Sequence, residues 1–144
     1  MNNLDIKYSS IFYNLKDINK INYLKEINIK FKKIKKLTIK NNNEDKEHKT
    51  TKKNFNDFFL FLFSLHKIDN HLIYLILKFK YCEINGKIFE HINRFKILRY
   101  LYIENINFDK GFIIKLNLLK LLSIISCNNI KLSGISNVRL KYYI

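Results

Sequence analysis

The sequence predicts an α/β fold in which short parallel strands alternate with helical segments. Two observations predict it. Short apolar runs recur at 72–79, 98–103 and 119–125, and the segments between them have helical apolar spacing. The apolar positions inside the runs also repeat, because Leu77, Leu101 and Leu122 follow one another at nearly equal intervals. Strands that alternate with helical segments form parallel sheets, so we expect these three leucines to lie side by side.

The N-terminal segment 1–30 is predicted to be helical. Ile11, Leu15, Ile18, Ile21 and Leu24 recur at helical intervals and form one apolar stripe. We expect this segment to cover the open end of the stack, because a stack of repeated units needs a lid at each end. Residues 1–40 would then comprise an N-terminal helical cap and a first degenerate repeat, whose side-chain pattern begins at Phe31 and reaches Asn42.

A polar stretch and an aromatic stretch follow. Residues 41–54 contain no apolar side chain, so we expect a polar mobile loop. Phe55–Leu65 carries apolar residues all round a helix, which predicts a helix that is buried on nearly all sides, with Asp57 as a possible cap. A strand is the alternative that periodicity leaves open.

The regular part of the chain begins at residue 72. Helical spacing predicts helices over 87–96, from Ile88, Ile92 and Phe95, and over 110–118. A fourth strand should begin near the end of the chain, because Leu140 follows Leu119 at the same interval at which Leu119 follows Leu98. Residues 55–144 form the predicted repeat region.

The units share a detailed pattern of side chains. In the last unit, apolar residues stand at Leu119, Leu122 and Ile124, with Cys127 at the ninth position. The other units are Leu98, Leu101, Ile103, Ile106 with Phe108, and Tyr74, Leu77, Phe79, Cys82 with Ile84. This pattern resembles that of the leucine-rich repeat (LRR) family, whose ninth position is Asn or Cys.

The resemblance implies a short solenoid in which the first, fourth and sixth positions of each unit point into a shared core. It also implies that Cys82 and Cys127 lie two strands apart, roughly 9–10 Å, beyond disulfide reach, as two free buried thiols. Outward residues would line a concave face that binds a protein partner. They are Ile76, Lys78, Lys80, Tyr100, Tyr102, Glu104, Leu121, Ser123 and Ile125. Exposed Leu121 and Ile125, near an unfinished end, would favour a partner or self-association.

The net charge of +15 favours an acidic partner such as nucleic acid. Ile, Lys and Asn nevertheless make up nearly half the chain, and their AT-rich codons indicate a biased genome, which weakens this inference. The alternative function is therefore non-specific phosphate contact through a dense basic stretch. Its lysines are Lys30, Lys32, Lys33, Lys35, Lys36 and Lys40.

The sequence contains no catalytic or cofactor motif. Its four histidines have no metal-ligand spacing, its three glycines are isolated, and no serine lies in a nucleophile-elbow context. We therefore expect a protein that is not an enzyme, with no cofactor or metal. Two cysteines without a paired motif, no signal segment and no apolar run long enough to cross a bilayer favour an intracellular protein without a membrane span.

Overall fold

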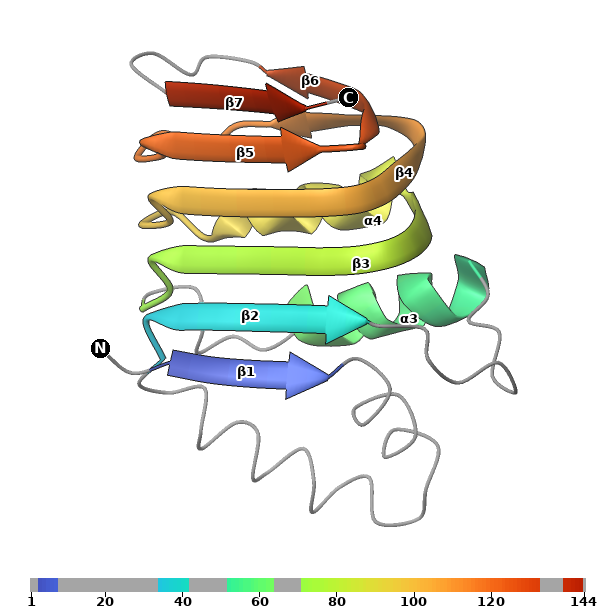
Figure 1. Cartoon of the computed structure of the whole chain (residues 1–144), viewed down its shortest axis with the longest axis horizontal. Helices are drawn as coiled ribbons and strands as arrows, with labels where there is room; N and C mark the ends of the chain where they lie inside the picture. The colour runs from blue at the N-terminus through green and yellow to red at the C-terminus, as the bar shows by residue number, and fades with distance from the viewer. Residues whose placement is uncertain (1–2, 8–33, 42–51, 64–70, 133–138, 144) are drawn as a thin grey trace, which may run out of the picture.

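The computed structural model describes residues 3–7, 34–41, 52–63, 71–132 and 139–143. Across these ranges the chain has an α/β fold built on a parallel sheet of strand order β1-β2-β3-β4-β5-β7, as predicted (Figure 1). A further strand, β6, pairs with the second half of β4. The strands are β1 (Asn3–Lys7), β2 (Lys36–Asn41), β3 (Tyr74–Asn85), β4 (Tyr100–Ile114), β5 (Leu121–Ile125), β6 (Asn128–Leu132) and β7 (Arg139–Tyr143).

The register of the sheet aligns one leucine from each successive strand. These leucines are Leu4, Leu37, Leu75, Leu101, Leu122 and Leu140. The predicted pairing of Leu101 with Leu122 is confirmed, whereas the prediction that Leu77 lies opposite Leu101 is wrong. Leu77 pairs with Ile103 instead, and Leu101 pairs with Leu75.

A β-bulge explains this error. The register of β3 against β4 shifts between Lys78 and Cys82, where the exposed residues Lys80 and Tyr81 stand next to each other. Before the bulge Tyr74 pairs with Tyr100, and after it Cys82 pairs with Ile106, so the two offsets differ. Only the second offset equals the predicted interval from Leu77 to Leu101. One repeat length therefore cannot describe both halves of β3.

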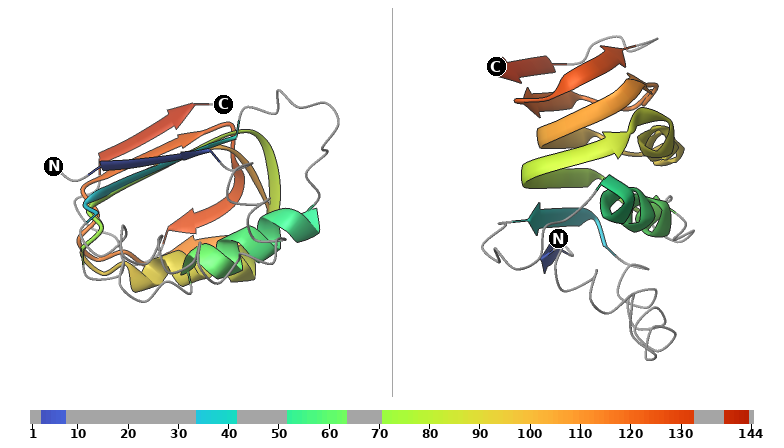
Figure 2. Two further views of the ribbon diagram at one scale, coloured as in Figure 1. Left: turned by 90° about the horizontal axis from the view of Figure 1, so that it is seen from below. Right: turned by 90° about the vertical axis from the view of Figure 1, so that its right-hand side faces the viewer.

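The core lies between the sheet and the helices that cover its inner side (Figure 2). Side chains alternate along the central strands β2 to β5, so that every second one points inward and is buried. Each inward side chain packs against those of the neighbouring strands, because one strand cannot bury its own face. The inward columns of the four central strands are Leu37, Leu75, Leu101, Leu122 and Ile39, Leu77, Ile103, Ile124.

Among the described residues, three helical elements close the inner side. They are α3 (Lys52–Phe63), α4 (Gly86–Phe89) and the 3-10 helix η1 (Glu90–Arg94). Phe89 of α4 lies among four other phenylalanine rings, with centroid distances between 4.8 and 5.7 Å. These rings come from α3 and β4, so an aromatic cluster joins the helices to the sheet.

The aromatic stretch at 55–65 is helical as far as Phe63, but two details of its prediction are wrong. Burial follows a stripe that includes Phe55, Phe59 and Phe63, while Leu60 on the other side is 45 % exposed. Asp57 does not cap the helix, because the helix begins more than a turn earlier, at Lys52. The helix therefore packs on the core through one apolar stripe and leaves its other side exposed.

The segment at 87–96 is helical as predicted, over α4 and η1, with Phe89, Ile92 and Phe95 buried and Ile88 only partly so. The helix predicted over 110–118 is absent, because β4 continues to Ile114 and buries alternate residues Phe112 and Ile114. An apolar run of this length fits both periods, and pairing with β6 decides for the strand.

The ends of the chain differ from the predictions in part. Residues 3–7 form β1 rather than a helix, and β1 is held by parallel pairing with β2. The stripe at 11–24 and most of the polar stretch, 42–51, lie outside the described residues. The fourth predicted strand is present as β7, although Leu140 pairs with Leu122 rather than occupying the position of Leu119.

Candidate functional site

The outward face of the sheet presents its side chains in three rows that run across the strands. The sheet register sets these rows, because residues at every second position point outward. The first row is Lys36, Tyr74, Tyr100 and Leu121; the middle row is Thr38, Ile76, Tyr102 and Ser123; the third row is Lys40, Lys78, Glu104 and Ile125. All the residues predicted to bind a partner lie in these rows except Lys80, which lies in the bulge.

Two tyrosines of the first row stack on each other. The rings of Tyr74 and Tyr100 are 4.3 Å apart at an interplanar angle of 4°, and both side chains are half-buried. Each ring restricts the rotamers of the other, so little conformational entropy remains to be lost on binding. Tyr74 was expected to point inward, but the observed register of β3 pairs it with Tyr100 and places it on the outward face.

A second aromatic contact links the middle and third rows. The ammonium of Lys78 lies over the ring of Tyr102, 5.3 Å from its centroid. Burial and the neighbouring Glu104 carboxylate raise the pKa of the Tyr102 phenol, which also hydrogen-bonds that carboxylate. The phenol is therefore neutral at physiological pH, and the three side chains form one connected group.

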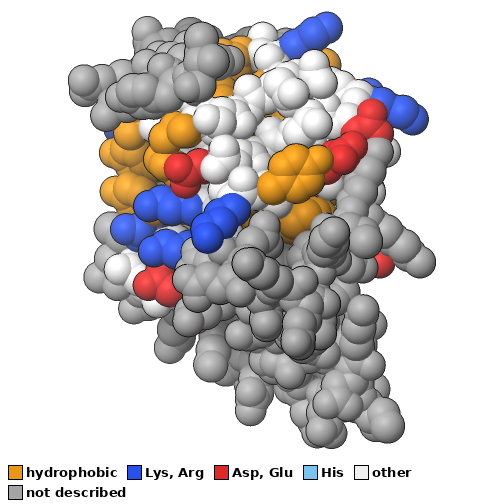
Figure 3. Space-filling model, turned by 45° about the vertical axis from the view of Figure 1, so that its right-hand side comes forward, with side chains coloured by type: hydrophobic (Ala, Val, Ile, Leu, Met, Phe, Trp, Pro, Cys, Tyr) orange, Lys and Arg blue, Asp and Glu red, His pale blue; other side chains and the backbone are white. Residues whose placement is uncertain are grey.

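An open hollow of about 320 Å³ lies at the carboxyl end of β2 and beside the middle of β3 and β4, near the bulge between those two strands. Lysine side chains gather on this part of the surface, with acidic side chains above and below them (Figure 3). Lys40 and Lys78 are direct partners across β2 and β3, and like charges in that position repel each other. An anionic group in the hollow would relieve this repulsion. Its lining is Lys40, Asn41, Lys78, Phe79, Lys80, Glu104 and Asn105.

Three predicted contact residues are less accessible than expected. Ser123 is buried at 8 % exposure, which leaves little of it for a partner to touch. Leu121 and Ile125, expected as exposed apolar residues at an unfinished end, are half-buried. The reason is that β7 pairs with β5 along its whole length, so β5 is an interior strand.

The basic stretch Lys30–Lys40 is described only in part. Lys30, Lys32 and Lys33 lie outside the described residues. Lys36 and Lys40 lie on the outward face at opposite ends of β2, and Lys35 lies just before the strand. The extended chain from Lys35 to Lys40 spans about 16 Å, so these two lysines do not form one compact patch.

Both cysteines are free, as expected. Cys82 is buried as predicted, but Cys127, also predicted to be buried, is only half-buried. Burial raises the pKa of both thiols, so neither is a reactive thiolate at neutral pH. The single S–H of Cys127 is shared between the backbone oxygens of Ile125, at 3.3 Å, and Ile103, at 3.5 Å. The second bond joins neighbouring strands.

In the middle unit an asparagine makes the corresponding hydrogen bond between neighbouring strands. The repeat pattern places Ile106 at the ninth position there. Asn105 has a left-handed φ of 57°, and its Nδ2 donates to the oxygen of Phe79 on the neighbouring strand at 2.8 Å. Asn tolerates this backbone conformation better than most residues, which explains its presence at the bend. The sequence signal was an Asn directly before the expected position.

Comparisons with protein-family models, curated proteins and solved structures found no match to the chain. Among the described residues, no group of three or more His, Cys, Asp or Glu side chains is placed to hold a metal ion. The helices within those same ranges are all too short or too polar to cross a membrane.

Proposed function

We propose that this protein is a short leucine-rich-repeat-like interaction module, without catalytic activity, that binds a protein partner on the outward face of its sheet. The columns of inward leucines and isoleucines support the repeat resemblance, since they recur strand after strand in one register. The side-chain bonds from Asn105 and Cys127 to neighbouring strands support it as well, because they occur at or beside the ninth repeat position.

The observation that carries the binding proposal is the ordered aromatic surface at the centre of the outward face. Tyr74, Tyr100 and Tyr102 are held by stacking or by a cation over the ring, and all three remain partly accessible. Tyrosine is enriched among the residues that contribute most to protein–protein affinity. The neighbouring hollow would accept an acidic side chain of the partner between Lys40 and Lys78.

The test begins with capture and identification of a protein partner by the immobilised full-length chain. Dissociation constants for the purified partner are then compared between the wild type and the Tyr102→Ala and Tyr100→Ala variants. We expect each variant to lose about 2 kcal/mol of binding free energy, or roughly 30-fold in affinity, as tyrosines central to an interface do.

Tyr81 provides a matched control. It is 57 % exposed but lies in the bulge, outside the three rows. Tyr81→Ala should change the affinity less than threefold. A partner that binds the Tyr102→Ala and Tyr81→Ala variants equally well would contact another surface, and the proposal would be wrong.

A further inference from the structure

The edge of the sheet at the amino ends of the strands carries a row of cations that comes from separate parts of the sequence. Lys35, Ile73, Arg99 and Lys120 each directly precede a strand and stack in that order. Each of the first three residues accepts, through its backbone oxygen, two N–H bonds from the next turn of the chain, at 2.7–3.1 Å. These paired bonds fix the alignment of the four residues.

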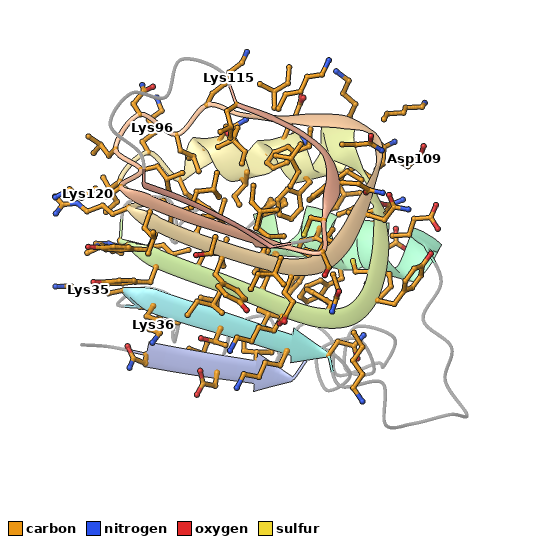
Figure 4. The ribbon with its side chains drawn as sticks, turned by 45° about the horizontal axis from the view of Figure 1, so that its top comes forward. Lys35, Lys36, Lys96, Asp109, Lys115 and Lys120 are labelled. Atoms are coloured by element: carbon orange, nitrogen blue, oxygen red, sulfur yellow. The ribbon has the colours of Figure 1, made fainter. Side chains whose placement is uncertain are left out.

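The cations of this edge are exposed and lie apart from the acidic residues that the structure describes. Lys35, Arg99 and Lys120 are exposed, as is Lys96 in the turn before β4. None of the four makes an ion pair with another residue of the described ranges. Figure 4 shows Lys35 and Lys120 on the same side of the sheet, with Asp109 at the opposite side. We call Lys35, Lys96, Arg99 and Lys120 the basic edge.

The described acidic residues lie elsewhere. The acid nearest to the row in the sheet is Asp5, in the middle of β1 and on the outermost strand. The others are Asp57, Glu83, Glu90, Glu104 and Asp109, in α3, the bulged half of β3, η1 and the later part of β4. Within the described ranges, therefore, no neighbouring carboxylate cancels the positive potential of the basic edge.

From this arrangement we propose that the basic edge binds the phosphate backbone of nucleic acid without sequence specificity, at a site separate from the outward sheet face. Neighbouring strands are about 4.8 Å apart, so the row from Lys35 to Lys120 spans about 14 Å. One strand of a duplex presents a phosphate about every 3.4 Å of axis, so a row of this length faces about four phosphates.

The chemistry of the edge favours phosphates over an acidic protein. The cations are long and exposed, and the hollow described above lies away from them, at the carboxyl end of β2 and beside the middle of β3 and β4. Sequence-independent phosphate binding requires only such a row of cations. Stacking covers one face of each ring in the pair Tyr74 and Tyr100, which reduces the aromatic surface on which bases could stack.

The test measures binding of the full-length protein to fluorescein-labelled 20-nucleotide single strands and 20-base-pair duplexes by fluorescence anisotropy, between about 50 and 200 mM KCl. With three or four phosphate contacts, affinity for the duplex should fall about 100-fold over this range. The charge-reversal variant K35E/R99E/K120E should lose at least about 30-fold in affinity at about 100 mM KCl. Its salt slope should decrease by about 2.7, three contacts at about 0.9 each.

The control variant K87E/K110E/K131E reverses three exposed lysines away from the edge and changes the net charge equally. It should lose less than threefold in affinity, and circular dichroism is used to check that both variants are folded. Equal losses in the two variants would mean diffuse attraction to the whole charge and would overturn the proposal. Wild-type protein that binds poly-L-glutamate but neither oligonucleotide would also overturn it, in favour of an acidic protein ligand.

Discussion

Gly86 distinguishes local helix propensity from tertiary packing, because the two predict opposite effects of the substitution Gly86→Ala. Gly86 is the first residue of α4, where alanine would by propensity stabilise the protein by at most about 1 kcal/mol. In the structure, however, an added Cβ would overlap the backbone oxygen of Lys110 and lie 2.7 Å from that of Gly111. Both atoms belong to the backbone of β4, so they cannot rotate away.

Overpacking typically costs about 1–3 kcal/mol, and rigid backbone contacts place this case at the upper end. We therefore expect Gly86→Ala to lower the free energy of unfolding by about 2–3 kcal/mol, or the melting temperature by roughly 7–10 °C for a chain of this size. Urea unfolding followed by far-UV circular dichroism measures the effect. If the slope of the unfolding free energy against urea concentration (the m-value) is unchanged, the substitution has destabilised the folded state itself.

Gly111 is the matched control. A Cβ there would meet its nearest neighbour, the Asn129 oxygen, at an ordinary 3.8 Å. Gly111→Ala should leave the stability unchanged or raise it by up to about 1 kcal/mol, because alanine reduces the entropy of the unfolded chain. If Gly86→Ala were as stable as the wild type, the close approach of α4 to β4 would be wrong.

Three further predictions concern stability, each measured by urea unfolding. Asn93→Ala should cost about 2 kcal/mol, because the Asn93 amide donates to the Ile113 oxygen at 2.9 Å and accepts from the Lys115 N–H at 2.8 Å; Asn93→Asp, which keeps the acceptor, should cost less. Phe89→Ala should cost about 3–5 kcal/mol, and a loss below about 1.5 kcal/mol would contradict its central place among the rings. Burial raises the pKa of the Cys82 thiol, so at a pH above the pKa of an unfolded thiol the folded state binds more protons than the unfolded state. The free energy of unfolding should therefore fall there as the pH rises, by at most about 1.4 kcal/mol per pH unit. A Cys82→Ala variant should lack that contribution.

The sequence was sufficient to predict the parallel sheet and the outward positions of Tyr100, Tyr102 and Glu104, because apolar residues alternate with other residues there and the alternation recurs at nearly constant spacing. It was not sufficient for Tyr74, whose direction depends on the bulge. A signal for the correct register was present, since Leu72, Leu75 and Leu77 also fit the repeat pattern and all three are buried. The rival alignment, in which Leu77 is the counterpart of Leu101, fitted that pattern equally well.

The basic edge could not be predicted in this way. Lys35, Ile73, Arg99 and Lys120 are separated by unequal and steadily shorter lengths of chain, so no single period brings them together. Their alignment depends on how much chain each turn uses outside the sheet. Only the backbone hydrogen bonds between successive turns reveal it.

The bulge between Lys78 and Cys82 separates two sets of paired residues in β3 and β4. Without the bulge, both sets would need the same offset between the two strands. Residues can be gained or lost there without shifting the outward rows or the inner aromatic cluster. Removing Lys80 and Tyr81 would give β3 the same offset to β4 on both sides of the bulge. Proteins made of such turns can accumulate insertions and deletions at the bends while the fold stays the same. If the turns descend from one repeat, the regular sequence spacing would therefore be lost long before the fold.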